Sequence, residues 1–446
     1  SMSVHEQKFT MQPEKCEKEI DALEEKNGIS LADEQRGAVM TALSSGCMVL
    51  TGGPGTGKTT TVNTIIELFE SLKLSVALAA PTGRAAKRMS QVTGREAKTI
   101  HRLLEMEYNG EEEASFHRNA KNPLEERVII VDEASMIDLL LMDALLHAIR
   151  PGSVLLLIGD ADQLPPVGAG YVLRDLIDSD RFTTIILNEI FRQAQKSAIV
   201  TNAHAINDGE YPDLHRKDGD FFYLYRDTEE QTAQTVAQLC ASRLPRTYGP
   251  QIRKKIQVIA PSRKGGSGTM RLNELLQSVL NPKVPERREK KFRDRIFREG
   301  DKVMQIRNNY DLSWERENNG MRQEGTGVYN GDIGRIEKID PTQECMIIRF
   351  DDRVVSYDFS LVDELELAYA VTVHKSQGSE YPVVILPIYR FSPRLMTRNL
   401  LYTAVTRASE MVILVGDEEQ VKAMVDNNRQ SKRYSALAKR LSTYEA

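Results

Sequence analysis

Short, almost continuously apolar runs alternate along this sequence with segments of helical spacing. The runs lie at residues 47–51, 76–80, 128–132, 154–160, 185–187, 256–260, 383–388 and 411–415. Runs rich in Val, Ile and Leu are typical of parallel strands that are buried on both faces, and parallel strands need crossover connections, usually helices. The sequence therefore predicts an α/β architecture built on parallel sheets.

Two stretches break this alternation and predict insertions. Residues 106–126 are polar and contain Asn109-Gly110, which is a hairpin signal. Residues 301–360 hold short β-branched segments separated by turn residues, a pattern that predicts a small antiparallel barrel or sheet. The 446 residues allow about three domains at roughly 150 residues each. We expect a polar helix over the first 27 residues, followed by two α/β halves that each carry an insertion.

Composition excludes several classes of protein. A hydrophobic content of 41% is enough to build cores, which excludes wholesale disorder. No apolar run approaches the ~18 residues of a membrane span, and we expect no secretory leader. The widely spaced cysteines form no CxxC pair, which argues against a zinc site or a disulfide framework. Free cysteines of this kind are typical of proteins in the reducing cytoplasm. The net charge of −5 gives no global indication of a nucleic-acid partner.

The segment GGPGTGKT, residues 52–59, matches the pattern G-x-x-x-x-G-K-[ST] between an apolar run and an amphipathic helical pattern. Backbone N–H groups of such a loop surround phosphate oxygens at a helix N-terminus. Lys58 is predicted to pair with the β- and γ-phosphates, and the Thr59 hydroxyl to bind Mg²⁺. The other residues predicted to hold the nucleotide are Gly53, Gly55, Thr56, Gly57 and Thr60. The alternative is a Gly-rich turn with an incidental lysine, but the complete pattern in this context favours nucleotide binding.

The segment VIIVDEAS, residues 128–135, supplies the second part of a hydrolytic site. Asp132 at the end of an apolar strand could hold Mg²⁺, and Glu133 could activate the attacking water. Taken alone, this carboxylate pair could equally cap the next helix. Together with the phosphate loop it predicts hydrolysis of a nucleoside triphosphate.

A longer series of motifs extends these two. In order they are LADEQRGAV (31–39), GGPGTGKTT (52–60), APTGRAAKRM (80–89), TIHRLL (99–104), VDEAS (131–135), GDADQLPPVGAG (159–170), LNEIFRQ (187–193), VTVHKSQGSEY (371–381) and LLYTAVTRA (400–408). From about residue 28 to the C-terminus, the series resembles superfamily-one helicases of the RecD-like group. The resemblance implies two RecA-like P-loop domains, at 28–190 and at 191–300 plus 361–446. It also implies a β-hairpin insertion in the first domain and an SH3-like barrel at 301–360 in the second.

The resemblance also implies roles around the nucleotide. Gln35 would read the adenine and Gln163 would sense the γ-phosphate. Arg192 and Arg407 would be arginine fingers that reach into a cleft between the two halves; without the resemblance, each would more simply be a surface or structural arginine. The QGSE segment, through Gly378 and Glu380, would approach the nucleotide from the second half.

A second set of residues would contact a nucleic-acid strand by the same resemblance. These are Pro81, Thr82, Arg84, Thr99, His101, Thr372, His374 and Lys375. The alternative for both histidines is a structural, hydrogen-bonded side chain. Because aromatic residues are sparse, we expect contacts with the backbone of the strand to outweigh base stacking.

The insertions acquire roles from the resemblance as well. The hairpin near Tyr108–Phe116 would act as a pin at the duplex junction, although its carboxylates would repel DNA and fit a solvated turn equally well. The barrel would guide nucleic acid. RecD-like proteins can carry a longer region ahead of the helicase core, so the chain is either a naturally short member or part of a longer protein.

We therefore expect an ATP- and Mg²⁺-dependent DNA helicase that translocates 5′→3′ on single-stranded DNA in recombination or repair. We expect it to be a cytoplasmic monomer that acts at duplex junctions, without membrane contact. The polarity rests on the resemblance alone. Two alternatives stay open: a helicase that acts on RNA, and an ATP-switched nucleic-acid binding or remodelling module without unwinding.

Overall fold

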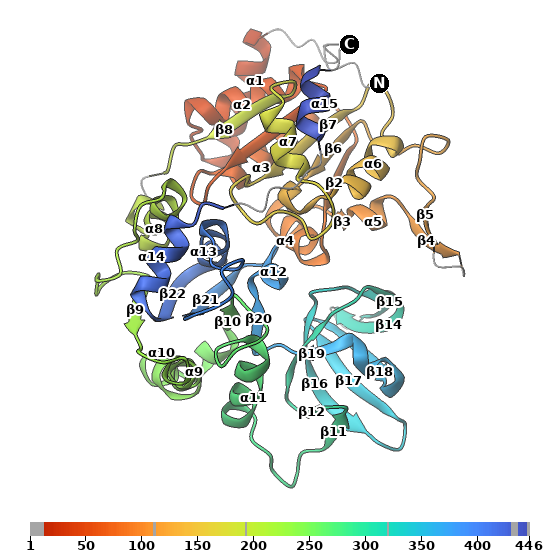
Figure 1. Ribbon diagram of the computed structural model, residues 1–446. Coiled ribbons are helices and arrows are strands. Elements are labelled where there is room, and N and C mark those ends of the chain that lie inside the picture. Colours follow the sequence, from red (N-terminus) through yellow and green to blue (C-terminus); the bar gives the residue numbers. More distant parts are fainter. Residues whose placement is uncertain (1–12, 110–112, 192–193, 319–320, 430–435, 444–446) are drawn as a thin grey trace. The chain divides into compact units, whose positions relative to one another are not determined.

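Figure 1 shows the computed structural model of the chain, which describes residues 13–109, 113–191, 194–318, 321–429 and 436–443. The chain divides into two compact units. The first contains the described residues up to His204 together with those from Arg429 onward. The second is Ala205–Asn428.

A parallel sheet of six strands forms the centre of the first unit, in the order β3-β2-β6-β7-β1-β8. Its strands are β1 (Cys47–Gly52), β2 (Val76–Ala80), β3 (Ala97–Thr99), β6 (Val128–Val131), β7 (Val154–Gly159) and β8 (Thr183–Leu187). Every residue of β1 is buried, with Met48 and Leu50 in one hydrophobic core and Cys47 and Val49 in the other. Both faces of the sheet are therefore covered, and the predicted α/β architecture is confirmed.

Helices lie on both faces of this sheet. The helices of the first unit are α1 (Pro13–Asn27), α2 (Asp33–Ser44), α3 (Lys58–Ser71), α4 (Gly83–Thr93), α5 (Ile100–Leu103), α6 (Leu139–Ala148), α7 (Val172–Asp178), the first part of α8 (Ala198–Asp208) and α15 (Leu437–Thr443). Helices α1, α2 and α3 share one core with the sheet, and α5, α6 and α7 share the other.

Helix α15 belongs to the first unit although it follows the second in sequence. Its Leu437 and Leu441 pack against the core of α6 and α7, and Arg181 donates a hydrogen bond of 2.8 Å to the Ser442 carbonyl. The family resemblance implies that the whole of 361–446 belongs to the second domain. Hydrophobic contacts far apart in sequence place this last segment with the first unit instead.

The predicted hairpin of the first unit is present. Strands β4 (Met106–Asn109) and β5 (Glu113–Phe116) pair antiparallel, and residues 110–112 between them lie outside the described residues. At the base of the hairpin, the Glu105 carboxylate contacts the His117 ring nitrogen at 2.8 Å and the Arg118 guanidinium at 2.9 Å. These contacts hold the pKa of Glu105 below its usual value and fix the two ends of the hairpin together.

A second parallel sheet forms the centre of the other unit, in the order β20-β10-β21-β22-β9. Its strands are β9 (Phe221–Tyr225), β10 (Ile256–Ala260), β20 (Ala370–Thr372), β21 (Tyr381–Ile388) and β22 (Ala408–Gly416). The helices of this part are α9 (Glu229–Gln238), α10 (Leu244–Tyr248), α11 (Thr269–Leu280), α12 (Val373–Ser376), α13 (Arg398–Val405) and α14 (Glu418–Asp426). Helices α9 and α11 share a hydrophobic core with one face of the sheet.

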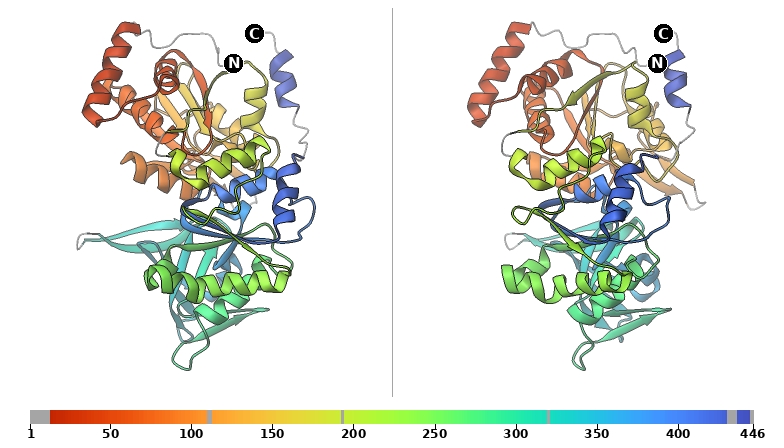
Figure 2. Two further views of the ribbon diagram at one scale, coloured as in Figure 1. Left: turned by 90° about the vertical axis from the view of Figure 1, so that its left-hand side faces the viewer. Right: turned by 60° about the vertical axis from the view of Figure 1, so that its left-hand side comes forward.

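An antiparallel insertion, here called the β-insertion, lies between β10 and β20 in sequence. Its seven-stranded sheet has the order β15-β14-β18-β17-β16-β13-β19, and a separate hairpin pairs β11 with β12. The strands are β11 (Glu289–Phe292), β12 (Arg295–Arg298), β13 (Lys302–Gln305), β14 (Asn309–Asn318), β15 (Met321–Val328), β16 (Ile333–Asp340), β17 (Cys345–Phe350), β18 (Arg353–Asp358) and β19 (Leu365–Leu367). The β14–β15 hairpin projects from this sheet (Figure 2). Around Tyr357 and Phe350 the insertion has a hydrophobic core of its own.

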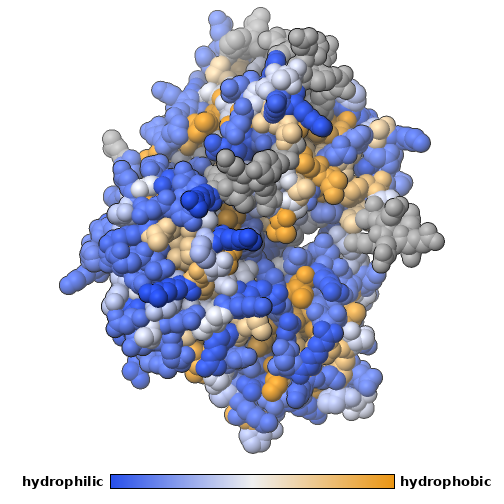
Figure 3. Space-filling view, in the orientation of Figure 1, coloured by the Kyte–Doolittle hydropathy of each residue, from blue (hydrophilic) through white to orange (hydrophobic). Residues whose placement is uncertain are grey.

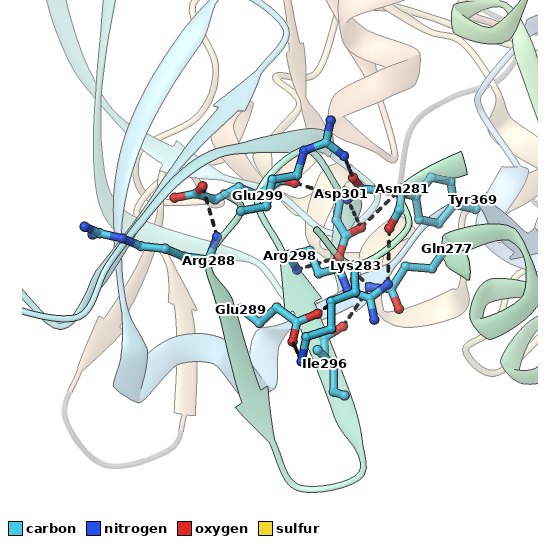
Figure 4. A network of polar contacts seen from close by, with 11 residues as sticks. Gln277, Asn281, Lys283, Arg288, Glu289, Ile296, Arg298, Glu299, Asp301 and Tyr369 are labelled. Carbon is cyan, nitrogen blue, oxygen red and sulfur yellow. Dashed lines mark hydrogen bonds and ion pairs between the residues drawn. The ribbon is translucent and has the colours of Figure 1, made fainter. Parts of the chain in front are cut away.

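One buried carboxylate joins the β-insertion to the second parallel sheet (Figure 4). Asp301 is fully buried and accepts hydrogen bonds from Gln277 Nε2 at 2.6 Å, Asn281 Nδ2 at 2.7 Å, the Arg298 backbone N–H at 2.7 Å and the Tyr369 hydroxyl at 2.9 Å. Burial raises the pKa of Asp301 although these donors favour the ionised form. The carboxylate thus connects α11, the β12–β13 turn and the segment that leads into β20.

The surface is mostly polar on the face that Figure 3 shows, with hydrophobic side chains in scattered patches. Within the described ranges, no helix combines the length and the apolar character that crossing a bilayer requires.

Candidate nucleotide site and strand-contact residues

The phosphate loop connects β1 to α3 and depends on two left-handed glycines. Gly55 and Gly57 both have φ of +76°, which glycine adopts without strain. A Cβ on Gly57 would lie 2.3 Å from Gln35 Nε2 and 2.6 Å from Phe191 Cε2, so a larger residue would have to displace these side chains as well as adopt a strained φ. The loop is therefore built to turn sharply and begin a helix whose first N–H groups can meet an anion.

Lys58, the first residue of α3, bends back over this loop. Its Nζ donates to the carbonyl oxygens of Gly52 and, at 2.6 Å, of Gly53. Burial lowers the pKa of Lys58, whereas Asp160, Asp132 and Glu133 act to raise it. A bound polyphosphate would add further negative charge beside the ammonium and favour its ionised form. Thr59 follows on the exposed side of the helix.

The carboxylates come from strands next to the loop. Asp132 follows β6 and Asp160 follows β7, while β7 pairs with β1. Burial and the charge of Glu133 raise the pKa of Asp132, and Arg88 and Lys58 oppose the shift. Parallel strands thus bring these charges to the carboxyl ends of the strands, where α/β proteins bind their ligands.

Glu133 has an unusual backbone. Its φ of +52° places a non-glycine residue in the left-handed region, and its N–H donates to Asp132 Oδ1 at 2.8 Å. Such conformations carry a cost and concentrate at functional sites.

Gln163 is held in the same cluster by Asp160. Gln163 Nε2 donates to Asp160 Oδ2 at 3.2 Å, and the Asp162 N–H donates to Asp160 Oδ1 at 3.0 Å. The Tyr171 hydroxyl donates to the Gln163 carbonyl oxygen at 3.3 Å. Asp160 and Arg88 are charged groups of this site that the sequence predictions omitted, although both lie inside motifs quoted above.

Gln35 is buried against the phosphate loop. Its Oε1 accepts from the Ala32 N–H at 2.9 Å, and its Nε2 donates to the Gly57 carbonyl at 3.1 Å. Both ends of the amide therefore have partners within the protein. In the structure, Gln35 stabilises the phosphate loop through its hydrogen bond to Gly57. The predicted adenine contact stays a prediction.

The two predicted arginine fingers differ in what the structure shows. Arg192 lies outside the described residues. Arg407 is buried in the second unit, where its guanidinium donates to the Thr403 carbonyl at 3.2 Å and the Ser379 carbonyl at 3.3 Å. The structure thus brings Arg407 to the QGSE segment, in which Gly378 has φ of +68° and Glu380 is exposed.

The predicted strand-contact threonines are all helix N-caps. Thr82 Oγ1 accepts from the Ala85 N–H at 3.2 Å, Thr99 Oγ1 from Arg102 at 3.1 Å, and Thr372 Oγ1 from Lys375 at 3.3 Å. Thr99 and Thr372 are the last residues of β3 and β20 and cap α5 and α12, and Thr82 follows β2 after Pro81 and caps α4. Their hydroxyls therefore stabilise these helices, whatever they contact beyond them.

The basic residues of this set have distinct surroundings. His101 is partly buried with its ring centroid 6.1 Å from that of Phe116, and burial lowers its pKa against the opposing charge of Asp138. His374 is exposed on α12, and Lys375 Nζ contacts Glu366 Oε2 at 2.7 Å. Pro81 and Arg84 flank the start of α4.

Comparison with protein families matches three successive parts of the chain. Residues 35–169 match the AAA domain, residues 272–350 the SH3 domain of ATP-dependent RecD-like DNA helicases, and residues 367–415 the UvrD-like helicase C-terminal domain.

Two curated relatives extend the match over most of the chain. The ATP-dependent RecD2 DNA helicase of Deinococcus radiodurans is 36% identical over 414 residues, which cover 93% of this chain and 53% of the relative. The RecBCD enzyme subunit RecD of Mycobacterium tuberculosis is 33% identical over 461 residues, covering 92% and 73%. The chain belongs to the RecD-like helicase family. It spans only about half the length of the Deinococcus relative.

Solved structures show the same fold for this RecD-like chain. A Bacteroides Pif1 helicase in complex with ADP-AlF3 and single-stranded DNA has 18% identity and a TM-score of 0.52, covering 89% of this chain and 94% of that one. Candida albicans Pif1 gives 20% identity and a TM-score of 0.51, covering 88% and 96%. The resemblance drawn from the motifs is confirmed, as are the two RecA-like sheets and the SH3-like β-insertion.

Proposed function

We propose that this chain is an ATP-dependent DNA helicase that moves 5′→3′ along single-stranded DNA. The observation that carries the proposal is the phosphate loop, over which Lys58 bends to contact the Gly52 and Gly53 carbonyls, with Asp132, Glu133 and Asp160 near enough to act on its charge. Family membership supports coupling of this site to strand separation. The polarity rests on the family resemblance alone.

The donor set suits Mg²⁺. Thr59 and Asp132 offer hydroxyl and carboxylate oxygens, which are the ligands that a hard divalent cation prefers, and the carboxylates around Lys58 favour added positive charge. When bound, the ion would neutralise charge on the β- and γ-phosphates.

The protein residues would then share the remaining work. The loop N–H groups and Lys58 would bind and orient the phosphates, and Glu133 would accept a proton from the attacking water. Gln163 would contact the γ-phosphate from its position on Asp160. Arg192 and Arg407 are proposed to stabilise the transition-state charge, for which Arg407 would exchange its contacts with Thr403 and Ser379 for phosphate oxygens.

The proposed nucleic-acid partner is single-stranded DNA next to a duplex junction. Bacteroides Pif1, which shares the fold, is described as bound to single-stranded DNA. The mycobacterial relative is described as a subunit of the RecBCD enzyme, whereas the Deinococcus relative carries no subunit designation. We propose that this chain acts as a monomer in the cytoplasm. A mass measurement on the purified protein would check the oligomeric state.

The test is unwinding of one DNA duplex that carries either a 5′ or a 3′ single-stranded tail, with ATP and Mg²⁺. Separation from the 5′ tail alone is the expected result. Separation from the 3′ tail alone would reject the polarity while keeping the helicase activity.

A matched RNA-tailed duplex separates the remaining possibilities. Equal or faster unwinding of RNA would favour an RNA helicase. ATP hydrolysis that a strand does not stimulate, without any unwinding, would favour the ATP-switched binding module.

A further inference from the structure

A single carboxylate in the second unit contacts three cationic side chains. Glu366 on β19 lies 2.7 Å from Lys375 Nζ, 2.7 Å from Arg263 Nη2 and 3.4 Å from Arg295 Nη2. We call these four residues the Glu366 cluster. An ion pair needs one cation for each carboxylate, so the cluster keeps two positive charges in excess.

The cluster lies at an edge of the second parallel sheet. Strands β10 and β20 pair in parallel with Ala260 opposite Thr372, and the segments that hold Arg263 and Lys375 follow these two strand ends. Arg295 comes from β12 and Glu366 from β19. The carboxyl edge of a parallel sheet is where α/β proteins bind ligands.

The charged groups are arranged with the carboxylate beneath and the arginines outward. The side chain of Glu366 is 19% exposed, whereas those of Arg295 and Arg263 are 36% and 53% exposed. Burial acts to raise the pKa of Glu366, but Lys375, Arg263 and Arg295 hold it below its usual value. Glu366 therefore stays ionised at neutral pH, and two guanidinium groups remain accessible to an anion.

We propose that Arg263 and Arg295 bind phosphates of single-stranded DNA beside Lys375, and that Glu366 is a counterion that limits the affinity for these phosphates. The inference rests on the proposed function and adds three residues to it. A moving enzyme must release each phosphate, and one carboxylate under three cations lowers the local charge from +3 to +2. Guanidinium groups suit this role because they bind phosphate through paired N–H donors.

The first test measures binding of a dye-labelled oligothymidine by fluorescence anisotropy over a series of salt concentrations. For single strands, the slope of log K against log salt changes by about 0.7 for each phosphate contact. Arg263→Gln and Arg295→Gln should each weaken binding about threefold to tenfold and flatten this slope by about 0.7. Arg263→Lys should keep the slope, because the charge is retained.

Lys255→Gln is the matched control. It removes one positive charge from the same unit, where Lys255 pairs with Glu410 at 2.9 Å. Its slope should equal that of the wild type. Arginine variants that bind with the wild-type slope, or a control that loses as much slope as they do, would overturn the proposal. A wild-type protein that binds no strand would instead overturn the proposed function.

Glu366→Gln gives a prediction of opposite sign. The local charge rises from +2 to +3, so the variant should bind the oligonucleotide more tightly, with a steeper slope and slower unwinding. A purely structural ion-pair cluster predicts unchanged or weaker binding, and that result would overturn the counterion role. Thermal melting and circular dichroism of each variant would show that the fold is retained.

Discussion

The two parallel sheets place opposite charge patterns at their edges. In the first unit, the carboxylates of Asp132, Glu133 and Asp160 act on the charge of the Lys58 ammonium. In the second, the Glu366 carboxylate contacts Lys375 and two arginines. The same scaffold thus offers one edge suited to a divalent cation with a polyphosphate and another suited to a phosphate backbone. The net charge of −5 conceals this difference, because it averages over the whole chain.

The largest effect is expected from a substitution in the phosphate site of the first unit. Lys58→Ala removes the cation of the phosphate loop and should lower ATP hydrolysis by about 10³-fold or more, roughly 4 kcal/mol of transition-state stabilisation. Binding of single-stranded DNA should be largely retained, because the second edge is intact. A coupled assay of phosphate release and an anisotropy titration would measure both, with Lys26→Ala, an exposed lysine paired with Glu67, as the control. Retained hydrolysis would remove Lys58 from the active site.

The joint between the second sheet and the β-insertion should show a stability effect instead. Asp301→Asn leaves one oxygen for four donors and directs an N–H₂ group at the others, so it should lower the free energy of unfolding by about 2–4 kcal/mol. Tyr369→Phe removes one of the four hydrogen bonds and should cost about 1 kcal/mol. Urea denaturation measures both, with Asp218→Asn at an exposed position as the control. Equal stability of Asp301→Asn and wild type would mean that the network does not hold the insertion.

Asp160→Asn tests a second charged residue at the phosphate site of the first unit. The substitution removes one charge that favours ionised Lys58 and places an N–H₂ group where Gln163 needs an acceptor. We expect kcat for ATP hydrolysis to fall about 30-fold to 100-fold, roughly 2–3 kcal/mol, with a smaller change in KM. Asp162→Asn is the control two positions along, where the carboxylate lies 3.9 Å from Arg174. A loss confined to KM, or an equal loss in both variants, would show that Asp160 does not position Gln163 for its proposed contact with the γ-phosphate.

The smallest effect separates capping from strand contact. Aspartate caps helices as well as threonine does, so Thr82→Asp and Thr372→Asp should leave thermal stability nearly unchanged. A carboxylate near a phosphate should nevertheless weaken oligonucleotide binding about tenfold, roughly 1.4 kcal/mol. Thr228→Asp, at the N-cap of α9, changes the same type of residue away from the predicted contacts. Binding that is unaffected in all three variants would leave Thr82 and Thr372 with a capping role only.

The sequence could predict the sheets and the phosphate site because both depend on local patterns. Continuous apolar runs marked the buried strands, and GGPGTGKT placed Lys58 after β1 and before α3. It could also place Asp132 at a strand end. The order of strands, which brings Asp160 beside that site, depends on pairing between distant segments and has no local signal.

The hydrogen-bond and ion-pair partners of individual side chains could not be predicted from the sequence, because they too depend on contacts between distant segments. The family resemblance implies that Gln35 reads the adenine, which stays a prediction. The hydrogen bonds of its side-chain amide to Ala32 and Gly57, which lie more than twenty residues apart, have no signal in the sequence. No motif linked Glu366 to Arg263 across 103 positions. Such contacts appear only when the chain is folded, and they decide which charges act together.

The position of α15 has a consequence for how the chain matures on the ribosome. Its Leu437 and Leu441 complete a hydrophobic core of the first unit, yet the whole of the second unit is translated between that core and this helix. Domains commonly fold in the order of synthesis. Here the second unit can finish folding first, while the first unit leaves part of its core exposed until α15 emerges.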